Sequence, residues 1–539
     1  MASVEEGASV ITVGKTTPIP AGQATSANSL PIVVASDQSP IPILDNLSAP
    51  SQVRDDLLGI PRVQTPLAIF DDINLIDIDP NIWAKNEQTT NNIRVTQVNH
   101  LLQQSCGEVL LTPSAANGNI ASLITKQSFP YQTGRITSAS FGVSMSRDTN
   151  ATMEYGMFDS TDGYFLRIVG DLLFYVRRTS SGERPQDHLN GYLGQGPDPT
   201  TFTVDSDVLI AQDKRTDLGT IYKLISSSPT VMEEIVPRQY WNGDKMVGED
   251  GGTILGAADA NSVHKLSLTN LVMTRIEYGW YGGTGSRIMF YVPVDANLPS
   301  GETVKTARWV IAHNLNCSDR IPYPSLGNPT LPMQFRIEKT GTISANSYIR
   351  KYGAQISIDG GDYSKLAVYS KDGAKVTGID TSTFEPLLVL RIKELITNNQ
   401  GESKRNLLRA FPLLLAMVSS HRAQFLLVKN PTTMSDASSN PVTAFTSTGT
   451  LSAIETNDPD SPTNAISGYT GGEQLASFFT GDADAATVSL TDIFSFARQY
   501  LTRESTAAAG TAGDVLLIAA RSIDNASNTC KASLTWGQR

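Results

Sequence analysis

The stretch from Leu271 to Val292, LVMTRIEYGWYGGTGSRIMFYV, limits the possible fold more than any other part of the sequence. Polar and apolar residues alternate in two runs, and a glycine cluster at residues 282–285 separates them. Period-two alternation of β-branched and aromatic residues indicates strands. Glycines supply the positive φ of a tight turn. The stretch therefore predicts a β-hairpin, with Trp280 and Phe290 anchoring its buried face.

The remaining sequence favours a mainly β protein. Gly 42 and Pro 28 in 539 residues, with only 18% charged residues, indicate many turns between short strands. We predict a large jelly-roll or lectin-like β-sandwich over residues 67–360. A turn-rich linker over 361–384 leads to a second β-rich domain over 385–539. Apolar spacing of i, i+3, i+4 predicts one short helix in this second domain, at residues 489–503.

Residues 1–66 are predicted to form an extended, proline-rich arm instead of a domain. Proline fixes φ and removes a backbone donor, which disfavours helix. Apolar residues lie between the prolines, and a solvated linker would not need them. We therefore expect a docking arm, with a disordered tail as the alternative. The expected contact residues are Leu30, Pro31, Ile32, Val33, Asp37, Gln38, Ile41, Pro42 and Ile43.

Several segments together resemble a known family. Residues 29–43, SLPIVVASDQSPIPI, resemble an SLPVxIASDQxxIPV-type segment of tailed-bacteriophage structural proteins. Residues 129–135, 157–165, 239–248 and 277–290 resemble further motifs of the same proteins, in the same order. Thr133 stands where a proline is expected, and residues are inserted between Trp280 and Arg287. The resemblance implies a tail, baseplate or fibre-associated protein, assembled in the host cytoplasm and located in the virion.

Charge and cysteine content exclude several partners. The net charge of −11 comes without a dense Lys/Arg cluster, so we expect no nucleic acid. Three widely spaced cysteines predict buried thiols in place of a disulfide framework. The N-terminus lacks the pattern of a cleavable signal, and apolar runs are too short to span a bilayer, so we expect no membrane partner.

The sequence offers no recognisable catalytic or metal motif. Phosphate loops, HExxH pairs and GxSxG elbows are missing from the sequence, so we expect no enzyme, no cofactor and no metal. Carboxylates at Asp359 with Asp362, and at Asp244 with residues 249–250, are better explained by turns than by calcium. Aromatic residues on the hairpin could stack on sugars, although core packing is commoner. The candidate glycan-contact residues are Tyr278, Tyr281 and Tyr291.

Together these features predict a non-enzymatic virion structural protein that joins other virion proteins through its arm. The alternatives are a carbohydrate-binding module that recognises a host surface glycan, and a capsid decoration or head-fibre protein. A polysaccharide-degrading spike enzyme is the least favoured. Open sheet edges and an apolar arm also predict a homo-oligomer. The phage resemblance implies that this oligomer is a trimer.

Overall fold

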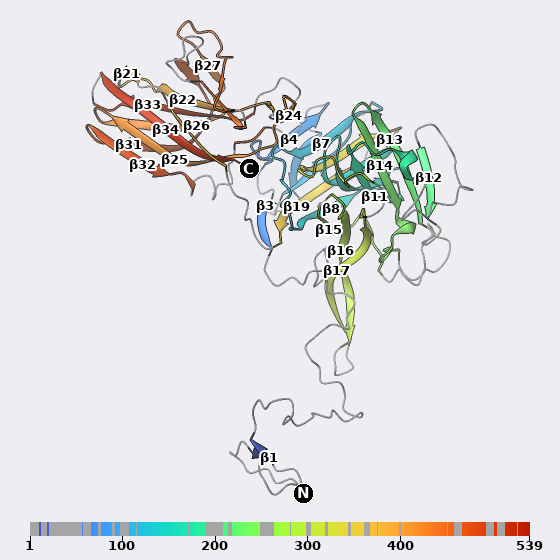
Figure 1. Cartoon of the computed structure of the whole chain (residues 1–539). Helices are drawn as coiled ribbons and strands as arrows, with labels where there is room; N and C mark the ends of the chain where they lie inside the picture. Colours follow the sequence, from blue (N-terminus) through green and yellow to red (C-terminus); the bar gives the residue numbers. More distant parts are fainter. Residues whose placement is uncertain are drawn as a thin grey trace. The chain divides into compact units, whose positions relative to one another are not determined.

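The computed structural model describes residues 10–11, 19–20, 57 and most of 66–538 (Figure 1). Its longer gaps after residue 66 are 98–106, 189–207, 248–263, 458–465, 492–500 and 504–512. The chain divides into two units, residues 1–52 and 53–539. In the first unit, β1 (Val10–Ile11) pairs antiparallel with β2 (Ile19–Pro20). The expected docking residues between 30 and 43 lie outside the described residues.

One sheet of the main sandwich contains nine strands among the described residues. All of its neighbouring strands run antiparallel, as expected for strands that alternate buried and exposed positions. In sheet order the strands are β12 (Val208–Asp213), β13 (Leu218–Ser227), β14 (Thr230–Pro237), β11 (Leu172–Thr179), β10 (Gly163–Val169), β9 (Ala151–Phe158), β18 (Met333–Lys339), β7 (Ile120–Thr125) and β4 (Trp83–Glu87).

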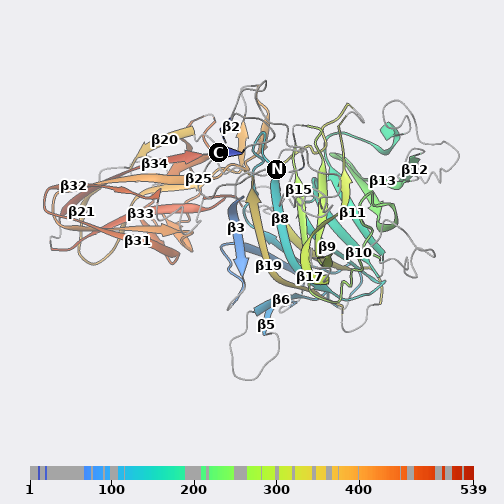
Figure 2. The ribbon, with the colours of Figure 1, turned by 90° about the horizontal axis from the view of Figure 1, so that it is seen from below.

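The described part of the second sheet contains eight strands, and Figure 2 shows β3, β19 and β8 side by side within it. In order they are β17 (Thr303–Leu315), β16 (Ser286–Asn297), β15 (Val272–Tyr278), β8 (Thr137–Met145), β19 (Ile349–Ile358), β6 (Gly107–Leu111) and β5 (Ile93–Gln97), with β3 (Leu67–Ile73) also on β19. Two 3₁₀ turns, η2 (Pro185–His188) and η4 (Arg238–Tyr240), complete this region.

The two sheets pack face to face over one apolar core. Phe141 of β8 and Tyr155 of β9 meet edge to face, with ring centroids 5.6 Å apart. The hydroxyl of Tyr155 also lies 2.8 Å from Thr274 Oγ1 on β15, so the buried phenol has a hydrogen-bond partner. These contacts across the two layers define a β-sandwich.

The hairpin predicted over residues 271–292 is confirmed as β15 and β16, with Ile276 opposite Ile288. Phe290 is completely buried and stacks on Trp241 at a centroid distance of 5.9 Å. Trp280 is only half-buried, and its Nε1 donates to the carbonyl of Leu326 at 3.1 Å. Phe290 is therefore the stronger of the two predicted anchors, because only its side chain lies wholly inside the core.

The C-terminal region forms a second sandwich, drawn in orange and red in Figure 1. The described strands of one sheet are β20 (Ala367–Asp372), β34 (Asn528–Gln538), β25 (Ala410–Ser419) and β32 (Asp484–Ser489), with β21 (Val376–Ile379) also on β34. Those of the other are β28 (Thr446–Ser447), β29 (Ile454–Asn457), β22 (Glu385–Ile392), β33 (Val515–Ser522), β26 (Ala423–Lys429) and β31 (Glu473–Thr480). Two small ribbons pair β23 (Leu395–Thr397) with β24 (Ser403–Arg405), and β27 (Thr433–Ser435) with β30 (Gly468–Thr470).

The prediction of a mainly β chain with two β-sandwich regions is confirmed, but the predicted linker is wrong over much of its length. Residues 367–372 and 376–379 form β20 and β21, which pair with β34. Most side chains of β20 are exposed, so its polar sequence resembled a linker. The predicted helix falls mostly on residues 492–500, which lie outside the described residues.

A buried arginine links the two sandwiches of the second unit. The Nε and Nη2 groups of Arg409 both donate to the carbonyl of Ser128, at 3.0 and 2.5 Å. The guanidinium also lies over the ring of Phe129, 5.0 Å from its centroid. Only 2% of Arg409 is exposed, so this contact holds a charge that water no longer solvates.

Within the described ranges, we find no helix with the length and apolar character needed to cross a membrane.

Candidate functional site

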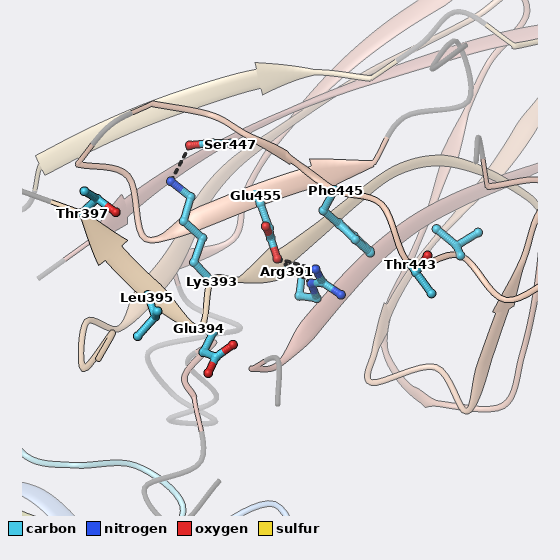
Figure 3. Close-up of a pocket in the computed structure, with 10 residues that line it drawn as sticks. Arg391, Lys393, Glu394, Leu395, Thr397, Thr443, Phe445, Ser447 and Glu455 are labelled. Atoms are coloured by element: carbon cyan, nitrogen blue, oxygen red, sulfur yellow. Dashed lines mark hydrogen bonds and ion pairs between the residues drawn. The ribbon is translucent and has the colours of Figure 1, made fainter. Parts of the chain in front are cut away.

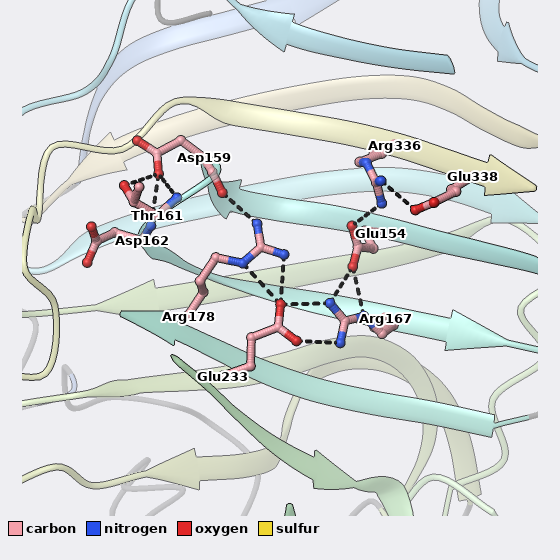
Figure 4. Close-up of polar contacts among 9 residues, drawn as sticks. All are labelled: Glu154, Asp159, Thr161, Asp162, Arg167, Arg178, Glu233, Arg336 and Glu338. Atoms are coloured by element: carbon pink, nitrogen blue, oxygen red, sulfur yellow. Dashed lines mark hydrogen bonds and ion pairs between the residues drawn. The ribbon is translucent and has the colours of Figure 1, made fainter. Parts of the chain in front are cut away.

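A ladder of alternating charges crosses five adjacent strands of the nine-stranded sheet (Figure 4). Glu233 on β14 accepts two hydrogen bonds from Arg178 on β11 and, through both oxygens, two from Arg167 on β10, at 2.7 to 3.0 Å. Arg167 also donates to Glu154 on β9 at 2.7 Å, and Glu154 accepts from Arg336 on β18 at 2.9 Å. Each link joins side chains on one face of the sheet, where cross-strand pairs stabilise pairing.

This charge ladder lies on the face of the sheet turned away from the main core. Its positions alternate with core residues such as Tyr155 and Leu166, as the two-residue period requires. A small apolar cluster that includes Phe165 shares this outer face. The guanidinium of Arg178 lies 4.9 Å and that of Arg167 5.4 Å from the Phe165 centroid. The cations are therefore held by ring contacts as well as by carboxylates.

The ladder fixes the charge of its central carboxylate. Burial alone would raise the pKa of Glu233, but hydrogen bonds and charges from Arg167 and Arg178 lower that pKa to about 2. Burial likewise opposes the charge of Arg167, yet Glu154 and Glu233 raise its pKa above the usual value. Glu154 and Glu233 are each 1% exposed. A carboxylate in this state cannot act as a general acid near neutral pH.

The nearby Asp162 has a turn-forming role. Burial raises the pKa of Asp162, and its oxygens accept from Ser180 Oγ and from the amides of Ser180 and Gly327. All three contacts donate to the carboxylate and hold two loops together. The charge ladder and its surroundings therefore link neighbouring strands and loops through buried charged groups.

An exposed apolar row crosses the outer face of the eight-stranded sheet. Met273, Tyr291 and Trp309 are directly opposite one another on β15, β16 and β17. Met273 is 43% and Tyr291 40% exposed, and the rings of Tyr291 and Trp309 lie 5.3 Å apart. The guanidinium of Arg275 covers Trp309 at 4.3 Å from its centroid. This aromatic row offers a surface on which a planar or sugar-like partner could stack.

The three predicted glycan-contact tyrosines have different positions in the structure. Tyr291 belongs to the aromatic row and is accessible. Tyr278 is completely buried, with its ring 5.9 Å from that of Tyr164, so the expected glycan contact there is wrong. The alternation that exposes Tyr291 on β16 turns Tyr278 of β15 into the core. Tyr281 lies outside the described residues.

A hollow of about 770 Å³ opens in the C-terminal sandwich (Figure 3). It lies beside the end of β22, where Arg391 and Lys393 project, and continues along β23. The rest of its lining comes from Glu455 of β29 and from Val442, Thr443, Phe445 and Ser447. A cavity of this size falls in the range that holds small ligands. No motif in the sequence marks its residues as a site.

Among the carboxylates considered for calcium, Asp244 serves other contacts. Asp244 lies with one oxygen 2.5 Å from His264 Nδ1 and accepts from the amide of Met246 at 2.8 Å. Asp362 and residues 249–250 lie outside the described residues. Across the part of the chain that the structure describes, no three His, Cys, Asp or Glu residues group in a way that could hold a metal ion.

Comparison with known proteins gives no family for this chain. No family model matches it, and the search of curated proteins finds no match. Among solved structures, the Emp47p carbohydrate recognition domain is 12% identical, over 55% of this chain and 97% of that one, with a TM-score of 0.21. Peanut lectin is 12% identical, over 55% of this chain and 98% of that one, with a TM-score of 0.19. Bacillus licheniformis β-glucanase is 10% identical, over 55% of this chain and 98% of that one, with a TM-score of 0.22. Similarities this weak carry no argument about function.

Proposed function

We propose that this chain is a non-enzymatic structural protein of a tailed-phage particle, joined to other virion proteins through residues 1–66. The resemblance of residues 29–43 to segments of phage structural proteins supports the location. The proline-spaced apolar residues of the arm support a docking role. The chain forms a homo-oligomer in the particle, with a trimer as the expected form.

The observation that carries the non-enzymatic part of the proposal is the charge ladder. Glu154 and Glu233 are the buried carboxylates at its centre, and both are neutralised by arginines on neighbouring strands. Such a network resists distortion of the sheet, and the cost of burying the charges is offset by several hydrogen bonds at once. A rigid sheet of this kind would suit a structural component of a particle.

Particle assembly tests the proposal directly. Phage particles are produced with the full chain or with a chain that lacks residues 1–66, and the purified particles are analysed for the protein. We expect the truncated chain to fold, by circular dichroism, and to be missing from the particles. A full chain with an added N-terminal tag is the control for altered ends. Normal incorporation of the truncated chain would refute the docking role of the arm.

Recognition of a host surface glycan is a second candidate function, and the aromatic row favours it. Tyr291 and Trp309 present adjacent rings at the surface of the main sandwich. We expect binding to a glycan array that is lost in a Tyr291→Ala variant. Leu172→Ala provides a control, because Leu172 is 51% exposed but lies on the other sheet. An array without signal, or equal signals from both variants, would remove this candidate.

A further inference from the structure

The hollow in the C-terminal sandwich has a rigid cationic wall. The Nε and Nη2 groups of Arg391 donate to the same oxygen of Glu455, at 2.7 and 2.5 Å. Phe445 supports the guanidinium from one side, with 3.8 Å between the guanidinium carbon and the ring centroid. In the described residues, Nη1 of Arg391 has no hydrogen-bond partner. Its two N–H groups therefore remain for a ligand, in a fixed plane.

Lys393 provides a second, differently shaped donor in the same wall. Its ammonium donates to Ser447 Oγ and to the carbonyl of Gly449, the latter at 2.9 Å. An ammonium has three N–H groups, so one remains. No described carboxylate lies within ion-pair distance of Lys393. Partial burial lowers the pKa of Lys393, and the nearby charge of Glu455 opposes this shift.

The backbone of Lys393 is also held in place. Its amide donates to the carbonyl of Ala453 at 2.9 Å, and its carbonyl accepts from Asn406 Nδ2 at 3.0 Å. Asn406 is 1% exposed and also donates to the carbonyl of Ala453, so it holds the backbone at Lys393 and at Ala453 together. A donor held on a fixed backbone loses little entropy when a ligand arrives.

The rest of the lining suits a ligand with hydroxyl groups and a limited apolar surface. Thr443, Ser447 and Glu394 contribute oxygen atoms, whereas Leu395 and Val442 contribute apolar surface. Figure 3 shows Lys393 and Arg391 on one wall, with Glu455 and Phe445 next to the guanidinium. A saccharide presents hydroxyls that can donate to carboxylates and C–H groups that can contact apolar side chains. A carboxylate on that saccharide would be the acceptor for the unused N–H groups.

We propose that this hollow binds one acidic sugar unit, with its carboxylate on Lys393 and Arg391 and its hydroxyls toward the oxygen-bearing side chains. The ring would lie against Leu395 and Val442. The site belongs to the C-terminal sandwich alone and is separate from the aromatic row on the main sandwich. It requires neither the virion location nor the docking arm, and its failure would leave both untouched.

Calorimetry on the full chain with free glucuronate tests the site. We expect glucuronate to bind at least tenfold more tightly than glucose, which lacks the carboxylate, and than acetate, which lacks the ring. Lys393→Met should weaken glucuronate binding at least tenfold, because it removes the ammonium and keeps the aliphatic stem. Lys531→Met is the matched control, because Lys531 is an exposed lysine of β34 that pairs with Asp372.

Each other outcome counts against the proposal. Equal binding of glucuronate and glucose would remove the role of the carboxylate. Equal binding of acetate would reduce the site to a simple anion site, and tighter binding of a short acidic peptide would change the ligand class. Unchanged binding in Lys393→Met, with a circular dichroism spectrum like that of the wild type, would move the ligand to another place on the chain.

Discussion

Glu233 is the carboxylate on which the charge ladder depends, so its replacement by glutamine should destabilise the main sandwich. Burial acts to raise its pKa, but Arg167 and Arg178 outweigh that effect and lower the pKa from 4.5 to about 2. One pKa unit corresponds to about 1.4 kcal/mol, so the ionised carboxylate contributes about 3 kcal/mol to the free energy of unfolding. Glutamine keeps the size of the side chain but leaves Arg167 and Arg178 without that negative charge.

The effect should depend on pH in a defined direction. Because the folded-state pKa is lowered, the contribution of Glu233 is fully present above pH 4.5 and is lost as pH falls toward 2. The difference between wild type and Glu233→Gln should therefore be largest near neutral pH. It should shrink as the pH is lowered below about 4.5.

Native-state hydrogen exchange on the full chain, read by mass spectrometry, can measure the loss of stability in the main sandwich separately from the C-terminal sandwich. We expect peptides from β10, β11 and β14 to lose protection in Glu233→Gln. Glu338→Gln is the matched control, because Glu338 lies at the end of the ladder, is 30% exposed and pairs with Arg336. Such a surface pair contributes about 1 kcal/mol or less. Equal losses of protection in both variants would refute the central role of Glu233.

Three further predictions test the core, the contact between the sandwiches and the oligomer. Phe290→Ala should cost about 3–5 kcal/mol and lower the melting temperature more than Trp280→Ala, since only Phe290 is fully buried; an equal or smaller shift would contradict this packing. Arg409→Met should speed hydrogen exchange at the amides of Ser128 and Phe129 by removing the donors to the Ser128 carbonyl; unchanged exchange would show that the contact is dispensable. Sedimentation of the purified chain should give a homo-oligomer, expected to be a trimer, and a monomer that is also present as one copy per particle would exclude it.

Much of the strand content could be predicted from the sequence, because period-two alternation is a local property. The hairpin at 271–292 was found because its apolar residues and its glycines occur within one short stretch. The polar strand β20 was missed for the same reason. Its side chains are mostly exposed, so no apolar alternation distinguishes it from a linker.

The candidate sites could not be predicted in the same way, because their partners are distant in sequence. Glu154 and Arg336 are separated by 182 positions, and Arg391 and Glu455 by 64. A charged residue inside an otherwise apolar strand, such as Glu154 in ATMEYGMF, was an available signal that a buried partner exists. It could not show which arginine would be that partner, since sheet order is set by the whole fold.

The strand order has a consequence for how the protein is made. β18 lies between β9 and β7, and β19 lies between β8 and β6, although both are the last strands of the main sandwich to be synthesised. During translation, neither sheet can be completed until residues 333–358 have left the ribosome. Until then, five strands of the future sheets, β3, β6, β7, β8 and β9, each lack a neighbour and can pair with other nascent chains. A chain released before β18 is made would therefore be prone to aggregate. Nascent chains that have reached only residue 332 must be kept from contacting one another until β18 and β19 have been synthesised.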